Sequence, residues 1–147
     1  MGLKKTKKII VAGSFDVLHP GHVKFLEWVK KKFKGKLIIV LARNESIEKM
    51  KERKAVFSER ERKIMLEAIR YVDKVIIGDK KEFLKPLLKE KPDVIVLGYD
   101  QWPNEKELEK RLRERGLCVK IVRAPPFNEK MWKSRKIIER IVRLFGR

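Results

Sequence analysis

The chain has 147 residues, of which 43% are hydrophobic and 40% are charged. This length fits one domain that buries its own core, so we expect a single domain over residues 1–147. The hydrophobic fraction excludes a disordered polyelectrolyte, and the single cysteine, Cys118, excludes an intramolecular disulfide. No apolar run approaches the roughly 18 residues of a membrane span, and segment 9–12 is too short for a signal-peptide core. We therefore expect a cytoplasmic protein.

The chain carries a formal net charge of +19, from 39 basic and 20 acidic residues. A basic surface attracts nucleic acid and also concentrates small anionic substrates. The alternative is a solvated surface laced with salt bridges and biased toward lysine and arginine. The single glutamine among abundant Lys, Arg and Glu resembles thermophile usage and favours this alternative. Charge alone leaves nucleic-acid contact open without requiring it.

Short runs rich in Ile and Val alternate with longer amphipathic segments along the chain. Nearly continuous apolar runs are typical of strands buried on both faces of a parallel sheet. We expect such strands at residues 8–12, 36–41, 74–77, 93–97 and 119–122.

Helices are expected between and after these strands. Val23, Leu26, Val29 and Phe33 recur at helical spacing, Ser58 begins a capping box, and Gly116 is placed to end a helix. The expected helices cover residues 22–33, 59–69, 81–90, 105–115 and 134–145, and the third is interrupted by Pro86 unless that residue falls in its first turn. This alternation predicts an α/β protein with a single doubly wound parallel sheet of the Rossmann-like kind. Such sheets bind ligands beyond the carboxyl ends of their strands.

The segment from Gly13 to His22 joins the first strand to the first helix. Pro20 suits the first turn of that helix, so backbone N–H groups and the helix dipole converge on one spot that favours phosphate. His19 and His22 are the only histidines and lie three residues apart, where both can donate to phosphate oxygens. Two alternatives stay open: a metal pair, which lacks a third nearby ligand, and ordinary residues at a helix start.

The full string resembles a known family. Gly13, Phe15, Asp16, His19, Gly21 and His22 match the GxFDxxHxGH motif of the cytidylyltransferase-like branch of the nucleotidyltransferases. The resemblance continues through residues 61–63, 69–73 and 98–101 to Ser134, so it covers nearly the whole chain. Residues 97–101 and 42–43 are most similar to the archaeal FAD synthetases, which adenylylate FMN. The resemblance also implies a homodimer.

The resemblance implies roles for individual residues. The backbone at Ser14 and Phe15, with Pro20, Gly21 and the two histidines, would hold the triphosphate. Asp100 would lie near the sugar or base of the nucleotide. Arg123 and Ser134 would complete the phosphate pocket, although the family's paired Ser/Thr at the last helix is here Lys133 followed by Ser134.

Other residues carry weaker signals. Lys51 and Arg53 lie in a predicted loop where they could close over phosphates, and a solvated charge run is the alternative. Arg62 is a further possible phosphate contact, with an exposed salt-bridged face as its alternative. Trp102 and Trp132 lie near the expected site loops and could stack on an isoalloxazine ring, whereas the helical spacing of Trp28 predicts a core residue. Residues 128–133 are the best candidate for a mobile segment.

The predicted reaction is attack by an acceptor phosphate on the α-phosphorus of ATP, or of CTP, with release of pyrophosphate. A phosphate monoester is largely ionised at neutral pH, so the reaction needs alignment and charge stabilisation, with a divalent ion, Mg²⁺, on the triphosphate. FMN is the expected acceptor. A cytidylyltransferase acting on a polyol phosphate such as glycerol 3-phosphate is the second hypothesis, and a non-catalytic nucleotide or nucleic-acid binder is the third.

Overall fold

The computed structural model describes residues 6–146, so the outermost residues of the predicted domain 1–147 lie outside it. Its centre is one five-stranded, fully parallel sheet with the strand order β3-β2-β1-β4-β5. The strands are β1 (Lys8–Gly13), β2 (Lys36–Leu41), β3 (Lys74–Ile77), β4 (Val94–Leu97) and β5 (Lys120–Arg123). The predicted fold class is therefore confirmed, and each strand lies within one residue of its predicted bounds.

Six helices accompany the sheet in the described part of the chain. They are α1 (Pro20–Phe33), α2 (Asn44–Lys51), α3 (Glu59–Glu67), α4 (Lys85–Glu90), α5 (Glu105–Glu114) and α6 (Ser134–Phe145). Helix α4 is shorter than predicted because Pro86 occupies its first turn, where a missing N–H costs no hydrogen bond. Helix α2 was not predicted, because its eight residues bury only Ile47 and carry little apolar periodicity.

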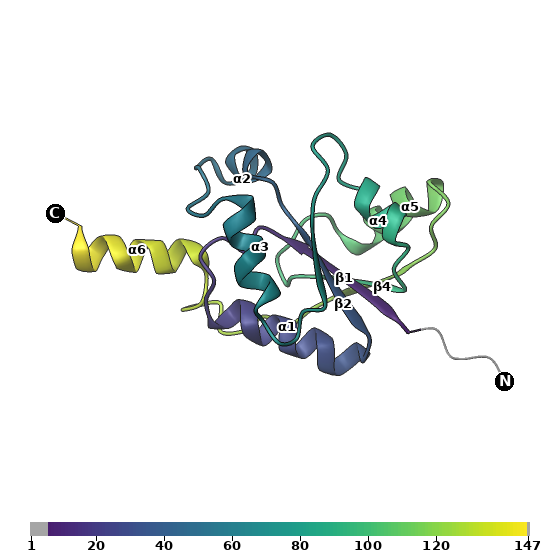
Figure 1. Cartoon of the computed structure of the whole chain (residues 1–147), viewed down its shortest axis with the longest axis horizontal. Helices are drawn as coiled ribbons and strands as arrows, with labels where there is room; N and C mark the ends of the chain where they lie inside the picture. The colour runs from purple at the N-terminus through teal and green to yellow at the C-terminus, as the bar shows by residue number, and fades with distance from the viewer. Residues whose placement is uncertain (1–5, 147) are drawn as a thin grey trace.

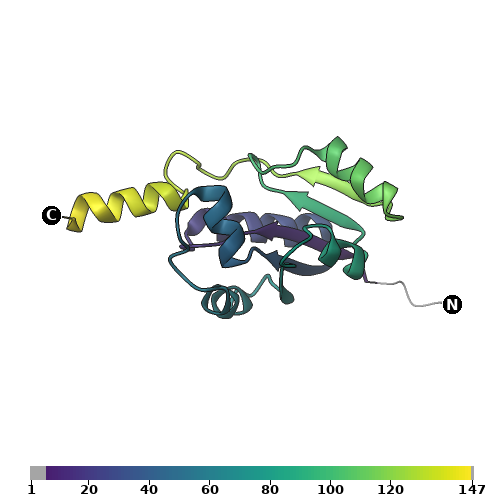
Figure 2. The same ribbon diagram turned by 90° about the horizontal axis from the view of Figure 1, so that it is seen from above.

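Alternate residues of the strands face two separate cores. One core joins the sheet to Leu26 and Val29 of α1 and Leu66 of α3, and the other joins it to Leu87 of α4 and Leu108 of α5. Figures 1 and 2 show these helices on the two faces of the sheet, with α6 extending away from it. The sheet is thus covered on both faces, which explains its nearly continuous apolar strands.

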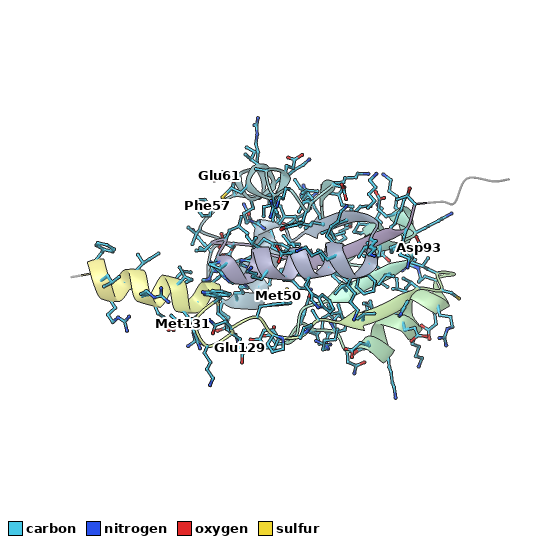
Figure 3. All side chains as sticks on the ribbon, turned by 90° about the horizontal axis from the view of Figure 1, so that it is seen from below. Met50, Phe57, Glu61, Asp93, Glu129 and Met131 are labelled. Carbon is cyan, nitrogen blue, oxygen red and sulfur yellow. The ribbon has the colours of Figure 1, made fainter. Side chains whose placement is uncertain are left out.

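The chain order of the strands reverses between β1 and β4, which are neighbours at the centre of the sheet. Loops that leave their carboxyl ends run to opposite sides of this point and leave a place for a ligand between them. The loop after β1 carries the histidine motif, and the loop after β4 carries Asp100. Figure 3 places Asp93, at the amino end of β4, far from Met131 and Phe57 at the opposite end of the molecule.

Within residues 6–146, no helix is long and apolar enough to cross a membrane.

Candidate active site

The loop between β1 and α1 has an unusual backbone. Phe15 and Val17 have φ angles of 47° and 60°, in the left-handed region that glycine prefers. For a β-branched residue such as Val17 this conformation is strained, so the surrounding structure must hold it in place. Contacts from three parts of the chain do so.

The first contact is made by Asp16, whose side chain is fully buried. Its carboxylate accepts hydrogen bonds from Arg53 Nη1 at 2.8 Å and from the backbone N–H groups of Val56 and Phe57 at 2.8 and 3.0 Å. Burial opposes this charge, but the Arg53 guanidinium and the two N–H donors outweigh it and lower the pKa of Asp16. Asp16 therefore ties the segment between α2 and α3 to the motif loop. The sequence alone gave no role for Asp16. A carboxylate inside a loop that favours anions would repel phosphate, and this indicates that its side chain bonds to another part of the chain.

The second contact is made by Arg62, which is completely buried. Its guanidinium donates to the carbonyl oxygens of Ser14, Ala42 and Phe57 and to Asn44 Oδ1, at distances of 2.7 to 3.1 Å. The predicted phosphate contact by Arg62 does not fit this placement, and neither does an exposed salt-bridged face. Arg62 instead joins the motif loop to the carboxyl end of β2 and to α2.

The third contact comes from the start of α6. Ser134 Oγ donates to the carbonyl oxygens of Asp16, at 2.6 Å, and Val17, at 3.2 Å. Next to it, Trp132 packs on Gly21, where a Cβ atom would lie 3.1 Å from the Trp132 Cβ and 2.8 Å from the His19 ring. Ser134 is thus brought to the motif as predicted, but its hydroxyl is engaged by the loop backbone. Gly21 is required for this close approach.

The two histidines cap the amino end of α1 reciprocally. His19 Nδ1 accepts the Gly21 N–H at 3.0 Å, and His22 Nδ1 accepts the His19 N–H at 3.2 Å. Their rings stack with centroids 3.8 Å apart. A ring nitrogen that accepts a hydrogen bond carries no proton, so each neutral ring has its proton on Nε2. The cap thus fixes both tautomers and provides two Nε2–H donors at a helix start that favours anions.

The environment keeps both rings neutral. Burial, the adjacent His19 and the charge of Lys51 lower the pKa of His22 from 6.5 to about 3. Burial and Lys51 also lower the pKa of His19. Neutral imidazoles with defined tautomers act as hydrogen-bond donors to phosphate across the neutral pH range.

This pKa shift predicts a loss of stability in mild acid. The unfolded chain takes up a proton at His22 below pH 6.5, whereas the folded chain resists it until about pH 3, so folding is favoured above pH 6.5 and weakened below it. We expect the free energy of unfolding to fall by about 2 kcal/mol more in the wild type than in His22→Asn between about pH 6.5 and 4.5. Denaturant titrations of both proteins across this range measure the difference. Parallel pH profiles would contradict the assigned state of His22.

Asp100 lies in the loop after β4. It is exposed, and its Oδ2 lies 3.5 Å from Lys133 Nζ, which also lies over the Tyr99 ring at 5.4 Å from the centroid. Tyr99 and the Asp100 carboxylate raise the pKa of Lys133, so this ammonium stays charged. Lys133 stands where the family usually has Ser or Thr. It therefore adds a positive charge beside Asp100, the residue predicted to bind the nucleotide.

Arg123 and Gln101 hold the Asp100 loop. Arg123 donates to the carbonyl oxygens of Gly98, Tyr99, Gln101 and Pro103 and pairs with Glu105. Gln101 Nε2 donates to the Ala12 carbonyl at 2.9 Å, and its Oε1 accepts the Gly98 N–H at 3.0 Å. The prediction that Arg123 contacts phosphate does not fit, because its guanidinium is surrounded by loop carbonyls. Its role is to position the loop.

Lys51 and Arg53 end up in different settings. Lys51 is the last residue of α2 rather than part of a loop, and its charge acts on both histidines. Arg53 does lie in the loop that follows, where its Nη1 is bonded to Asp16 and to the Lys54 carbonyl. Lys51 therefore lies close enough to the motif for its charge to act on the histidines. Arg53 instead stabilises the loop between β1 and α1 through its bond to Asp16.

The sequence predicted Trp28 in the core and Trp102 and Trp132 near the site loops, and the structure places them there. Trp28 packs against Phe33, Phe127 and the core around α1, as its helical spacing predicted. Trp132 lies against Gly21 of the motif, and Trp102 is 62% exposed in the Asp100 loop. Both therefore lie on segments that border the site.

A sheet whose switch point holds a histidine-capped helix start defines a nucleotide-binding α/β protein, and comparison with known proteins gives the family. The chain belongs to the cytidylyltransferase-like family, whose model matches residues 10–140. The resemblance inferred from the motif is confirmed.

Individual relatives agree with this assignment. The chain is 39% identical over 146 residues to an FAD synthase of Korarchaeum cryptofilum, covering 97% of each protein. It is 42% identical over 139 residues to an FAD synthase of Ferroglobus placidus, covering 94% of this chain and 90% of that protein. Among solved structures, a lipopolysaccharide core biosynthesis protein of Thermoplasma volcanium superposes with a TM-score of 0.80 and 32% identity, covering 84% of this chain and all of that one.

Proposed function

We propose that this protein is an FMN adenylyltransferase, which transfers the adenylyl group of ATP to FMN and forms FAD and pyrophosphate. The observation that carries this proposal is the pair of neutral histidines whose Nε2–H groups are free of the helix cap. Similarity to FAD synthases along nearly the whole chain selects the acceptor and the base.

In this reaction a phosphate oxygen of FMN attacks the α-phosphorus of ATP. A new P–O bond joins the two phosphates while the bond between the α-phosphorus and its bridging oxygen breaks, and pyrophosphate leaves with that oxygen. The second pKa of a phosphate monoester is about 6, so the nucleophile is already ionised and no protein base is needed. The protein aligns the groups and stabilises the charge that grows on the leaving pyrophosphate.

The residues at the site suit these tasks. His19 and His22 would donate to phosphate oxygens, and Lys51 and Lys133 would add positive charge to the site. Asp100, exposed at the carboxyl end of β4, would contact the nucleoside. Trp102, which is exposed on the same loop, would stack on the flavin ring.

A divalent ion, Mg²⁺, would neutralise the triphosphate. Among residues 6–146, no three His, Cys, Asp or Glu side chains come together as a metal site. Mg²⁺ commonly keeps several waters and binds through substrate phosphates with one or two carboxylates. The described part of the chain therefore suits an ion that arrives on ATP rather than one held by a protein cage.

We expect FMN and ATP with Mg²⁺ to give FAD and pyrophosphate in stoichiometric amounts. The assay crosses ATP and CTP with FMN and glycerol 3-phosphate, and measures pyrophosphate release and FAD by chromatography. Turnover of CTP with glycerol 3-phosphate, without FAD, would replace this function by the cytidylyltransferase. Inactivity with all pairs, together with salt-sensitive RNA or DNA binding, would favour a non-catalytic binder.

Replacing Asp100 by alanine should weaken ATP binding about tenfold or more without changing the free energy of unfolding. Its side chain is exposed and its one polar contact, to Lys133, is long, so folding does not depend on it. Loss of one hydrogen bond to a ligand costs about 1.5 kcal/mol, or roughly tenfold in affinity. Calorimetric titration of ATP measures the change, with Glu114→Ala on the exposed side of α5 as control. Equal affinities for the two variants would remove Asp100 from the site.

A further inference from the structure

The hydroxyl group of Tyr99 is buried and has no hydrogen-bond partner. Among residues 6–146 it is the only buried side-chain oxygen or nitrogen atom without one. Burying a hydroxyl in this way is unfavourable, so such groups are rare and call for an explanation. Tyr99 lies between the end of β4 and Asp100, at the end of the sheet where ligands bind. A bound ligand is therefore the natural partner for this hydroxyl.

The side chain of Lys133 lies over the ring of this tyrosine. Its Nζ is 5.4 Å from the ring centroid and 3.5 Å from Asp100 Oδ2. Both contacts are long, and the side chains of Lys133 and Asp100 are 42% and 61% exposed. An ion pair this exposed is weak, so a more highly charged anion can take the place of the carboxylate.

The start of α6 offers Lys133 such an anion. Lys133 is the N-cap residue of this helix, and its side chain does not cap it. The hydroxyl of Ser134 is already bonded to the carbonyls of Asp16 and Val17. A phosphate at this helix start would therefore meet backbone N–H groups and the Lys133 ammonium rather than the hydroxyl. A triphosphate carries several negative charges against the single charge of Asp100, so it competes well for the ammonium.

We propose that Lys133 is a latch and that Tyr99 binds the nucleoside once the latch opens. In the free protein Lys133 lies over Tyr99 and pairs with Asp100. When a nucleoside triphosphate binds, the ammonium moves to its phosphates. This motion leaves the Asp100 carboxylate and the Tyr99 hydroxyl to bond to the sugar or base. The inference rests on the proposed function for the identity of the ligand, and it makes Lys133 and Tyr99 determinants of specificity.

The latch makes nucleoside binding depend on phosphate. Adenosine has no phosphate to attract Lys133, so it must break the pair with Asp100 without compensation. ATP breaks the same pair and gives the ammonium a stronger partner. Removing Lys133 should therefore weaken the binding of ATP and strengthen the binding of adenosine. A lysine that only added charge to the site would change ATP binding alone.

Calorimetric titration of ATP into four proteins tests the latch. They are the wild type, Lys133→Ser, Asp100→Asn and the double variant. Either single replacement removes a ligand contact and also the need to break the pair. The product of the two single losses counts this gain twice, whereas the double variant has it once. We therefore expect the double variant to lose about two- to fivefold more affinity than that product at about 0.05 M salt, and less excess at about 0.5 M.

The outcomes of this cycle exclude each other. A loss equal to the product would mean that the pair survives binding or has no effect. A loss smaller than the product would mean that Lys133 supports Asp100 in the bound state. Either result would overturn the latch.

Tyr99→Phe gives a readout that a structural role would not produce. It removes the hydroxyl and keeps the ring under Lys133. Since the hydroxyl has no partner within the described chain, the free energy of unfolding without ligand should stay the same or rise. Affinity for ATP should fall about five- to tenfold, as for the loss of one hydrogen bond to a ligand. A less stable variant, or one with unchanged ATP affinity, would overturn the role of Tyr99.

Tyr71→Phe is the matched control. The Tyr71 hydroxyl bonds to Glu27 and Arg70, before the amino end of β3 and away from the ligand end of the sheet. This variant should be less stable than the wild type and should bind ATP with the same affinity.

Adenosine completes the test, with its binding measured by equilibrium dialysis of the labelled nucleoside. We expect Lys133→Ser to bind adenosine about two- to fivefold more tightly than the wild type, and equal binding would overturn the latch. The proposed function fails separately. If no FAD forms but the excess loss appears, the latch stands and the acceptor is wrong. If FAD forms and the losses multiply, only the latch is wrong, and a wild type that does not bind ATP would overturn both.

Discussion

Replacing His19 by asparagine is expected to lower single-turnover rates about 10²- to 10³-fold while leaving the protein as stable as the wild type. Asparagine is among the best residues at a helix N-cap, so its Oδ1 can accept the Gly21 N–H in place of His19 Nδ1. Asparagine cannot place a hydrogen-bond donor at the position that the Nε2–H group of His19 occupies. Loss of one donor to charge that develops in the transition state typically costs 10²–10³ in rate, or about 3–4 kcal/mol.

His19→Ala is the matched variant for this test. It removes both the cap and the donor, so it should show the same loss of rate and an additional loss of about 1 kcal/mol in the free energy of unfolding. Binding of ATP in the ground state should change little in either variant, because the donors act mainly as the pyrophosphate leaves. Near-normal single-turnover rates in His19→Asn would show that the histidine only holds the helix start.

His22→Ala should also lower the single-turnover rate by about 10²–10³. Because both rings would serve the same developing charge, the double variant should lose less than the product of the two single effects. The rings stack 3.8 Å apart and share one reciprocal cap, so they are expected to act as a unit. Full additivity in the double variant would indicate two independent roles.

Replacing Arg62 by leucine is expected to produce the largest loss of stability, about 4 kcal/mol. Arg62 is completely buried and donates to four oxygens, and its removal leaves the Ser14, Ala42 and Phe57 carbonyls without this donor. A buried hydrogen-bond acceptor that loses its donor typically costs about 1–3 kcal/mol, and three carbonyls lose a donor here. Denaturant unfolding of the two proteins measures the change.

Arg60 provides the control for this substitution. It lies two residues away on α3 and is exposed, so Arg60→Leu should change the free energy of unfolding by no more than about 0.5 kcal/mol. A cost for Arg62→Leu as small as this would show that Arg62 does not hold the loop and would return it to the candidates for phosphate binding.

The local pattern of residues was enough to predict the sheet and the position of the histidine motif between its first strand and first helix. Ile- and Val-rich runs indicate strands buried on both faces, and the amphipathic segments between them predict crossover helices, which together require a parallel sheet. The histidine pair beside Pro20 marks a helix start that favours phosphate, because helix geometry follows from nearest neighbours along the chain. All five strands and the motif lie where this reasoning placed them.

The roles of the arginines were decided only by the tertiary structure. Arg62, Arg53 and Arg123 were interpreted as phosphate contacts, but their partners are carbonyls and carboxylates up to 48 residues away in the chain. A guanidinium satisfies a buried loop as readily as a phosphate, since both present oxygen acceptors. Sequence spacing says nothing about which acceptor the fold brings within 3 Å. The same reason applies to α6, because an amphipathic pattern predicts that a helix buries one face, whereas only the folded chain shows that most of this face lies beyond its own core.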